Sequence, residues 1–251
     1  MVDDDNPENA GAAVPLGPET LARLRGVGTA TLTMQLLKRG LRSVWMAGPQ
    51  AIGPGPRLVG EAFTLRFVPQ REDLARLDTL GGPGSTRAAI EAVEPGRVVV
   101  IDACGLATCG TLGDILIARL RARGAAGVVT DGGMRDLAEV RALGVPVFCA
   151  GPAAPPSLTG LFFVAWQETI GCGGVAVVPG DLVVGDEDGV VVVPRALADE
   201  VAEESQEQER FERFVRQRVD RGDPVTGLYP PNEATLAAYR RWLNDGELGG
   251  S

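Results

Sequence analysis

The feature that most constrains the fold is a series of short, almost continuously apolar runs that alternate with amphipathic segments. The run RVVVIDA at 97–103 shows no apolar and polar alternation, which is typical of a strand covered on both faces. Two further runs follow at 127–130 and 145–151, and the segments at 112–123 and 136–143 are typical of helices. Strands that alternate with single helices indicate βαβ units and a parallel layer. The sequence therefore predicts an α/β fold.

After Gly151 the pattern changes to short β runs joined by tight turns. Runs at 161–166, 174–181 and 182–194 are separated by Pro-Gly-Asp and Glu-Asp-Gly sequences, which favour chain reversal. We therefore expect an antiparallel portion and mixed sheets. The other predicted elements are a helix from Pro18, a helix over 29–39, a strand over 63–68, a helix over 85–96 capped by Ser85 or Thr86, and helices over 195–220 and 233–245.

The chain is long enough for one large domain or two small ones, and we favour one domain with extensions. Its 251 residues and 45% hydrophobic content allow a sizeable core. Residues 1–17 are rich in Asp, Asn, Gly, Ala and Pro without periodicity, so they are predicted to be a disordered arm. Residues 18–195 form the predicted main domain, and 196–251 a helical extension whose glutamates are expected to face water or a partner.

The charge of the chain excludes some classes of partner. A formal net charge of −9 without a basic stripe argues against nucleic-acid binding, because phosphate contacts need clustered Lys and Arg. No apolar run approaches the roughly 20 residues that cross a bilayer, and the acidic start MVDDDNPENAG is unlike a signal peptide. We therefore expect a cytoplasmic protein without a membrane partner.

The residue types that are missing narrow the chemistry further. The chain has no histidine, which removes imidazole-based nucleophilic systems and imidazole metal sites. Its four cysteines have no CxxC spacing and are expected to be reduced, small apolar residues. The single lysine, Lys38, is expected on the polar face of a helix that ends at Gly40. Any metal would have oxygen ligands, so Mg²⁺ or Mn²⁺ is favoured over zinc or copper.

The segment TLGD at 111–114 opens a predicted helix. Thr111 and Asp114 have the spacing of a capping box, and Gly113 would let a ligand approach the backbone amides of 113–116. Such a site would suit a carboxylate. A helix start without any ligand explains the same residues equally well, because this motif is frequent.

The segment DGGMRD at 131–136 follows the next strand. Asp131 and the two glycines are typical of a tight turn, and Asp136 would favour the positive end of the next helix. Alternatively, Arg135 could clamp a substrate carboxylate or enolate and Asp136 could bind a hard cation. Taken alone, the motif favours the turn. In open α/β sheets, however, sites form where strands end and helices begin, and Asp102 ends the strand before these segments.

Taken together, these stretches resemble the RraA-like family, which includes 4-hydroxy-4-methyl-2-oxoglutarate aldolases. The resemblance covers about residues 58–195 and rests on RVVVIDA, GDILIARLRARGAAGVVTDGGMRD, VPVFCAG and GDLVVGDEDGVVVVP. The spacing between GDIL and the RD pair is its most specific part. The charged C-terminal helix and the YPPNE segment resemble a longer branch labelled ribonuclease activity regulator.

The resemblance implies a layered α/β/β/α sandwich with mixed sheets and a trimer or hexamer with sites at subunit interfaces. The helical extension would pack on its own domain or on a neighbouring subunit. It also implies that Arg135 binds a pyruvate moiety, that Asp136 anchors Mg²⁺ or Mn²⁺ partly through water, and that Asp114 handles a water that serves as acid or base. Asp102 would have a supporting place, and Glu209 or Glu212 would approach a neighbouring subunit's site. The backbone that would hold the substrate carboxylate is that of Gly113, Asp114, Ile115 and Leu116.

The expected chemistry agrees with the composition. Cleaving a C–C bond beside a 2-oxo group leaves an enolate, which needs either a lysine iminium or a cation to hold its charge. We therefore expect a metal-dependent aldolase or decarboxylase that acts on a small 2-oxo acid. The alternative is a regulator that binds a ribonuclease E-like partner, although that type departs from the RD pair at its acid whereas this chain keeps Asp136 and Asp114. A third interpretation is an oligomeric protein whose site has lost its activity.

Overall fold

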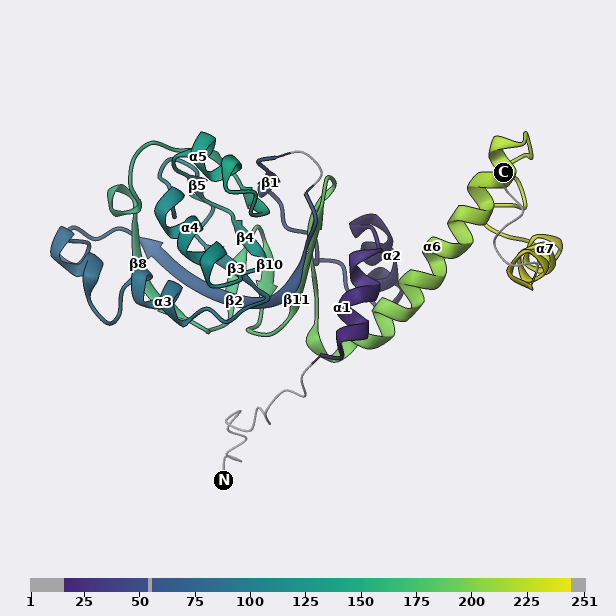
Figure 1. Cartoon of the computed structure of the whole chain (residues 1–251), viewed down its shortest axis with the longest axis horizontal. Helices are drawn as coiled ribbons and strands as arrows, with labels where there is room; N and C mark the ends of the chain where they lie inside the picture. Colours follow the sequence, from purple (N-terminus) through teal and green to yellow (C-terminus); the bar gives the residue numbers. More distant parts are fainter. Residues whose placement is uncertain (1–15, 54–55, 245–251) are drawn as a thin grey trace, which may run out of the picture.

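The computed structural model describes residues 16–53 and 56–244, which form a curved mixed sheet covered by helices and a protruding helical arm (Figure 1). The main sheet has eight strands, and β8 pairs with β2 beside the principal order. That order is β1 (Gln50–Ala51), β6 (Val147–Cys149), β4 (Gly127–Thr130), β3 (Arg97–Asp102), β2 (Leu58–Pro69), β11 (Leu182–Asp186) and β12 (Gly189–Val193), with β8 at Leu161–Trp166.

The predicted parallel layer is confirmed. Strands β2, β3, β4 and β6 pair in parallel, and the connections between them carry α3 (Thr86–Ala92), α4 (Asp114–Ala122) and α5 (Leu137–Ala142). Ser85 rather than Thr86 caps α3, because its hydroxyl accepts a hydrogen bond from the Ala88 amide at 3.3 Å. The carboxyl ends of these strands consequently meet at one edge of the sheet.

The antiparallel portion is also confirmed, with different boundaries. Strand β11 pairs antiparallel with both β2 and β12, and β8 pairs antiparallel with β2. The strand predicted over 174–181 is shorter: β10 (Val175–Val177) pairs with β9 (Ile170–Cys172). It ends early because the Asp181 carboxylate accepts the Val178 amide at 2.9 Å and closes a turn. Two short strands, β5 (Gly133–Met134) and β7 (Gly151–Pro152), form a separate parallel pair.

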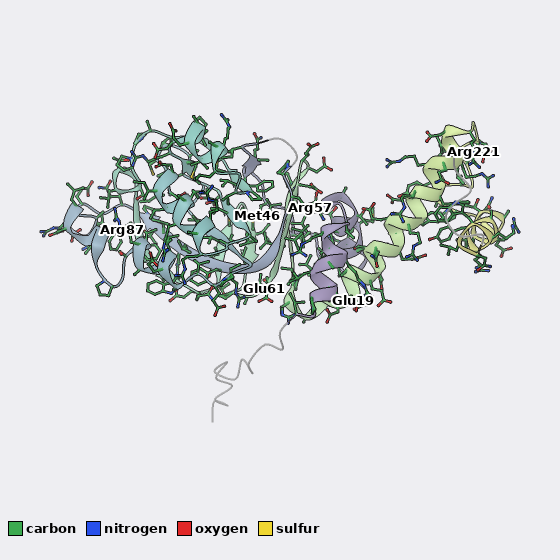
Figure 2. All side chains as sticks on the ribbon, viewed as in Figure 1. Glu19, Met46, Arg57, Glu61, Arg87 and Arg221 are labelled. Carbon is green, nitrogen blue, oxygen red and sulfur yellow. The ribbon has the colours of Figure 1, made fainter. Side chains whose placement is uncertain are left out.

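The layers follow the alternation of side chains along the strands. On β3, Val99 and Ile101 face the cluster under α3, α4 and α5, whereas Val98 and Val100 pack on the other face against the curled β11–β12 hairpin. The outer side of that hairpin is covered by α1 (Pro18–Arg25), α2 (Thr29–Lys38) and the start of α6 (Ala198–Asp220). The predicted α/β/β/α arrangement is therefore present. Arg57 lies where the sheet meets α1, and its guanidinium donates to the carbonyls of Leu24 and Val27 (Figure 2).

The C-terminal helices form the arm in Figure 1. Helix α6 packs against α1 and α2 near its start, then carries α7 (Glu233–Asn244) at its outer end. An aromatic cluster of Phe211, Phe214, Tyr239 and Trp242 holds the two helices together. Within residues 16–53 and 56–244, no helix combines the length and the apolar character needed to span a bilayer.

Three short 3₁₀ helices complete the described elements: η1 (Leu77–Gly81), η2 (Ser157–Thr159) and η3 (Arg195–Leu197). The last of them runs directly into α6. The division into domains stays a prediction. The proposed arm over 1–17 lies almost entirely outside the described residues.

Candidate active site

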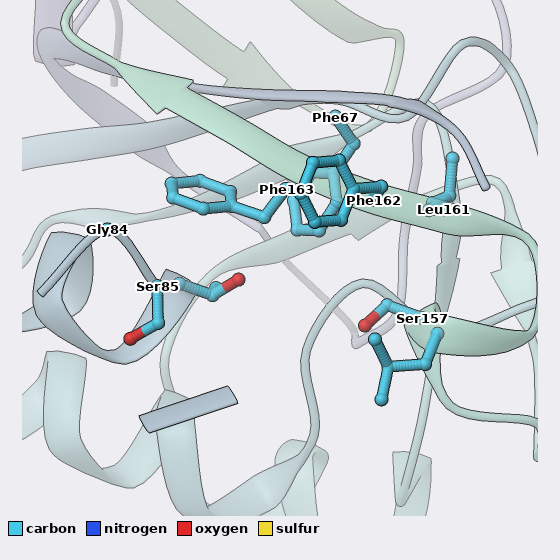
Figure 3. Close-up of a pocket in the computed structure, with 9 residues that line it drawn as sticks. Phe67, Gly84, Ser85, Ser157, Leu161, Phe162 and Phe163 are labelled. Carbon is cyan, nitrogen blue, oxygen red and sulfur yellow. The ribbon is translucent and has the colours of Figure 1, made fainter. Parts of the chain in front are cut away.

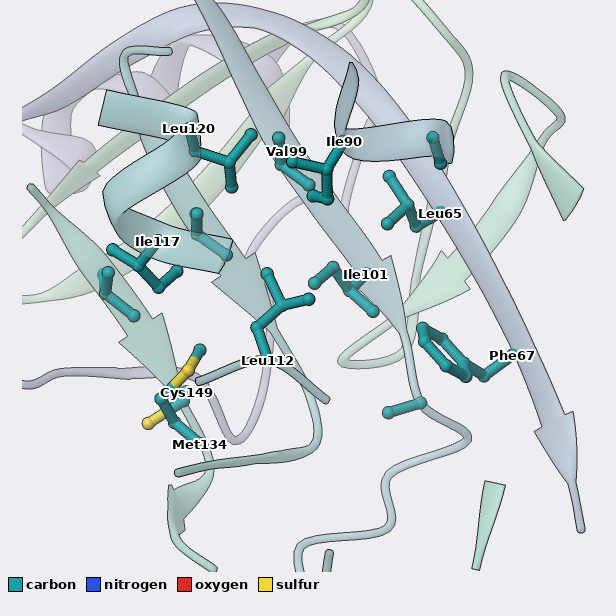
Figure 4. Packing of buried hydrophobic residues seen from close by; sticks show 14 of the residues in the cluster. Leu65, Phe67, Ile90, Val99, Ile101, Leu112, Ile117, Leu120, Met134 and Cys149 are labelled. Carbon is teal, nitrogen blue, oxygen red and sulfur yellow. The ribbon is translucent and has the colours of Figure 1, made fainter. Parts of the chain in front are cut away.

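The TLGD and DGGMRD segments lie side by side in the structure. The Thr111 amide donates to the Gly133 carbonyl at 2.9 Å, and the Arg135 amide donates to the Leu112 carbonyl at 3.0 Å. Leu112 and Met134 alternate with these contacts and point into the core beneath α4 (Figure 4). Two buried apolar side chains therefore fix the position of both segments, and the chemistry-bearing residues lie on the opposite side.

The amino end of α4 has no side-chain cap. The capping box predicted for Thr111 is wrong, because the helix starts two residues later, with Gly113 as its N-cap and Asp114 as its first residue. The Thr111 hydroxyl instead donates to the Gly133 carbonyl at 3.2 Å, since residue 111 lies before the helix. The first amide that bonds within this turn is that of Ile117, which donates to Gly113. The amides of 114–116 are thus available to an anion, as helix amino ends generally are.

Arg135 lies beside this helix end with a cationic group that lacks a counter-charge. Its Nε is buried and has no hydrogen-bond partner, and no carboxylate pairs with it among the residues that the structure describes. Its chain passes over Gly110, where a Cβ atom would lie 2.2 Å from Arg135 Cγ. A buried guanidinium nitrogen without a partner is costly unless a ligand completes it. Arg135 is therefore suited to an anionic ligand.

Asp136 adopts an unusual backbone conformation next to Arg135. Its φ of 54° and ψ of 43° lie in the left-handed region, which costs a non-glycine residue of the order of 1–2 kcal/mol. It is the N-cap residue of α5, as predicted, but its side chain does not cap that helix. The carboxylate is turned towards α4 instead, so that a Cβ atom on Gly113 would lie 2.5 Å from Asp136 Oδ2. Gly113, Arg135 and Asp136 are thus brought together, as predicted.

The remaining predicted residues of this segment have different surroundings. Asp114 is half-buried in the first turn of α4, and Leu116 packs against the main core cluster. Ile115 is 76% exposed. Only the backbone of Ile115 and Leu116 is therefore placed to serve a ligand at this helix end.

The residues present fit a hard cation that is held mainly by water and substrate. In the described part of the chain, no group of three or more His, Cys, Asp or Glu gathers into a metal cage. Mg²⁺ is commonly held by one or two carboxylates together with waters and substrate oxygens. Asp136 offers such a carboxylate, because it is exposed and forms no ion pair within residues 16–53 and 56–244. The carboxylate can lie at the helix end because residue 113 is glycine, and a side chain there would collide with it.

Replacing Asp136 by glycine is expected to leave the protein as stable as the wild type or up to about 1 kcal/mol more stable, because glycine adopts positive φ without strain. The same variant is expected to lose cation binding. Urea unfolding and Mn²⁺ titration measure the two properties separately. A clear loss of stability in Asp136→Gly would mean that the carboxylate has a structural role that its contacts do not reveal.

The carboxylates of Asp131 and Asp102 accept hydrogen bonds from backbone amides in the loops around the site. Asp131 is buried and accepts hydrogen bonds from the amides of Ala103 at 2.7 Å, Gly105 at 3.1 Å and Gly173 at 3.3 Å. Burial raises the pKa of Asp131, and the three amides oppose that change. Asp102 accepts the amide of Cys104 at 2.9 Å. Both residues therefore hold loops at the carboxyl ends of β3 and β4, and no contact joins Asp102 to Arg135 or Asp136 in the described residues.

The two C-terminal glutamates have partners within their own chain. Glu209 accepts the Gly28 amide at 3.0 Å and the Thr31 hydroxyl at 2.7 Å, so it caps the amino end of α2. Glu212 accepts bonds from Gln208 and from the Tyr229 hydroxyl. The sequence did not indicate the role of Glu209, because Gly28 and Thr31 are about 180 positions away along the chain. A role for either residue at a neighbouring subunit's site stays a prediction.

The cysteine thiols and the single lysine are poorly suited to act as nucleophiles. All four cysteines are free and three are buried, as expected, whereas Cys104 is exposed. Burial raises the pKa of the Cys172 thiol well above its usual value and also raises that of Cys104, so neither favours the thiolate. Lys38 is exposed on α2, as predicted, where its ammonium donates to the Gln35 side chain at 3.2 Å.

A cavity and a groove lie away from this edge. A cavity of about 90 Å³ lies between the start of α3 and β8, lined by residues that include Ser85, Ser157 and Phe163 (Figure 3). It is smaller than a typical ligand site of roughly 300–1,000 Å³. A groove of about 620 Å³ is lined by residues of α2, α6 and α7. Neither space is lined by Arg135 or Asp136, and Asp136 is exposed, which places the RD pair at the surface.

Comparison with known proteins identifies a family for this chain. Residues 29–192 match the model of the RraA-like family, described as Aldolase/RraA. The protein of Halalkalibacterium halodurans named "Putative 4-hydroxy-4-methyl-2-oxoglutarate aldolase" is 38% identical over 154 residues, which are 61% of this chain and 67% of that protein.

Two solved structures share the fold. Streptomyces coelicolor RraAS2, described as an unusual member of the RNase ES inhibitor RraA protein family, is 39% identical with a TM-score of 0.74, over 82% of this chain and 99% of that one. An uncharacterized protein of Pseudomonas syringae pv. tomato is 28% identical with a TM-score of 0.77, over 87% and 96% of the two chains. Since the family match spans well over half of the sequence, the chain belongs to the RraA-like family.

Proposed function

We propose that this protein is a lyase that uses a divalent cation to cleave a C–C bond of a small 2-oxo acid through a pyruvate enolate. The observation that carries the proposal is the convergence of three features on one open edge: the uncapped amino end of α4, the unpaired Arg135 and the carboxylate of Asp136. One anion and one cation would be held side by side there. The relative from Halalkalibacterium halodurans supports an aldolase, as its name indicates.

In this proposal each residue has a separate task. Arg135 and the amides of 114–116 bind the carboxylate of the 2-oxo acid, because a guanidinium and a helix amino end both favour an oxyanion. Asp136 holds Mg²⁺ or Mn²⁺, which when bound supplies positive charge for the developing enolate. Asp114 orients a water that moves the proton.

Two reactions fit the same groups. In an aldol cleavage, a base removes the proton of the 4-hydroxyl group, the C3–C4 bond breaks and its electrons form the pyruvate enolate, which a proton then quenches at C3. In oxaloacetate, the bond to the departing carboxylate breaks and CO₂ leaves behind the same enolate. Arg135 serves both reactions because it binds the part of the substrate that they share.

The open edge also supports a site that a second subunit completes. Ile115 exposes an apolar side chain next to the polar groups, and these residues line neither the cavity nor the groove described above. A partner surface would cover both features and exclude water, which strengthens charge interactions in the site. We propose a homotrimer or hexamer on this ground and on the family resemblance.

The test is a coupled assay of pyruvate release from oxaloacetate and several 4-hydroxy-2-oxo acids, with Mg²⁺ or Mn²⁺. The wild type is expected to release pyruvate from at least one of them, and Arg135→Ala and Asp136→Ala are expected to lose about 100-fold or more in kcat/KM. Arg135→Ala should mainly weaken substrate binding, whereas Asp136→Ala should mainly abolish the response to the cation.

A matched control is Arg119→Ala. Arg119 also lies on α4, but it is exposed in the last turn, away from the amino end, and pairs with Glu91 at 2.6 Å. It should keep wild-type activity, since exposed ion pairs contribute little. A wild type that is inactive on all of these substrates would refute the proposal. Wild-type activity in Arg135→Ala and Asp136→Ala would refute the site.

A second candidate function is a regulator that binds a ribonuclease E-like partner. The 39% identity with RraAS2, described as belonging to an RNase ES inhibitor family, favours it. Such a protein needs a binding surface but no enolate site. Binding to a ribonuclease E-type enzyme at micromolar concentration that survives in Arg135→Ala and Asp136→Ala would support it, and absence of binding would remove it.

A further inference from the structure

Two buried hydroxyl groups contact the turn at residues 131–136, called the RD turn below because it carries Arg135 and Asp136. Thr130 ends β4 and is fully buried, and its Oγ1 accepts the Gly132 amide at 3.0 Å. Thr111 is 4% exposed, and its Oγ1 lies 3.5 Å from Thr130 Oγ1 and 3.2 Å from the Gly133 carbonyl. The two side chains therefore connect the segment before α4 to the turn that carries Arg135.

The turn itself leaves little freedom around these contacts. A Cβ atom on Gly132 would lie 2.6 Å from Ala103 Cβ and 3.0 Å from Thr111 Cγ2. On Gly133 it would lie 2.5 Å from Ala153 Cβ. The backbone of the turn is thus closely packed between the loops that follow β3 and β6. The hydrogen bond to the Thr130 hydroxyl sets the direction in which the chain leaves β4.

We propose that Thr130 is a positioning residue for Arg135 and Asp136, acting through the Gly132 amide and through Thr111. This inference rests on the proposed function, since it assigns a role in that same site. The hydroxyl does not touch the ligand. It fixes where the chain turns two residues before Met134, and the position of the guanidinium and the carboxylate follows from that turn. A small displacement of such groups is costly, because binding and catalysis depend on their alignment.

The test compares Thr130→Val, which keeps the shape and removes the hydroxyl, with Thr130→Ser, which keeps the hydroxyl. In Thr130→Val the Gly132 amide loses its acceptor, and KM for the 2-oxo acid is expected to rise about tenfold, the effect of one lost hydrogen bond. The change in kcat should be smaller, because Arg135 binds the part of the substrate that does not react. Thr130→Ser should return KM to within about threefold of the wild type.

Thr64 provides a matched control in the same sheet. It lies on β2, is fully buried like Thr130, and its hydroxyl donates to the Glu168 carbonyl at 2.6 Å. Thr64→Val therefore removes one buried threonine hydroxyl bond at a place that does not contact the RD turn. It should reduce stability to a similar extent as Thr130→Val while KM stays unchanged.

A second measurement separates this inference from the proposed function. Hydrogen exchange of the backbone amides at 131–136 is expected to be faster in Thr130→Val than in the wild type and Thr64→Val, whatever the activity. A wild type without pyruvate release but with this exchange pattern would overturn the function and keep the role of Thr130. Equal KM in Thr130→Val and Thr64→Val, or exchange at 131–136 that matches the wild type, would overturn the inference.

Discussion

Gly110→Ala is expected to abolish the activity of the site, with a loss of about 100-fold or more in kcat/KM. The added Cβ would lie 2.2 Å from Arg135 Cγ and 3.0 Å from the Arg135 amide nitrogen. The first contact can be relieved only by moving the arginine side chain, and the second involves backbone that pairs with Leu112. Arg135 must therefore leave its place beside the amino end of α4.

The folded state of this variant should survive. Overpacking of this kind costs about 1–3 kcal/mol, which an ordinary domain tolerates. Kinetic assays and urea unfolding on the same preparation measure both effects. Gly171→Ala is the matched control, because Gly171 lies in β9 with open space around its Cα and without a positive φ. Activity in Gly110→Ala within twofold of that control would show that the place of Arg135 is not critical.

The fold could be predicted well where the apolar pattern decides the structure. The run at 97–103 is buried on both faces because α3, α4 and α5 cover one side and the β11–β12 hairpin covers the other. The alternation of strands and helices predicted the parallel order, and the turn sequences predicted the antiparallel part. Strand β9 was missed, because three residues before a Gly-Gly turn leave no pattern to detect.

The candidate site was predicted only in part. Arg135 and Asp136 could be found because the DGGMRD and TLGD segments together resemble the RraA-like family, whereas DGGMRD alone favours a structural turn. The role of Thr111 was misjudged, since the same spacing fits a capping box and a helix that starts two residues later. Gly110 carried no signal at all. Its importance arises from the approach of a side chain 25 positions away, and such a contact is created by the fold and not by local sequence.

The caps on α2 illustrate the same limit. Glu209 and Asp186 both accept hydrogen bonds from residues at the start of that helix, at Gly28, Thr29 and Thr31. From the sequence, Glu209 belonged to an acidic stretch and was a candidate for a neighbouring subunit's site, and nothing indicated a cap on α2. Its specific use depends on α6 crossing α2, which no local pattern contains.

Asp131→Asn is expected to reduce both stability and activity. The asparagine keeps one acceptor oxygen but turns an amide donor towards three backbone amides, which should cost about 2–4 kcal/mol. The loop at 103–105 and the turn at 131–136 are held by this carboxylate, so pyruvate release should fall as well. Asp181→Asn is the matched control: Asp181 is equally buried and accepts two backbone amides, but these belong to Val178 and Arg195. It should lose stability and keep the activity of the folded fraction.

The pH dependence of the unfolding free energy provides a second measurement for Asp131→Asn and Asp181→Asn. Burial raises the pKa of Asp131 and that of Asp181, so the folded state holds each proton more tightly than the unfolded chain, in which aspartate titrates near about 4. The stability that comes from this proton is fully present below that value and is lost as pH rises through the raised folded pKa. The difference in unfolding free energy between wild type and either variant should therefore be larger at acidic pH than at neutral pH. Urea unfolding followed by tryptophan fluorescence at several pH values measures it. A difference that grows towards neutral pH would show that the amides outweigh burial and lower both pKa values, in which case these carboxylates stabilise the loops mainly as anions.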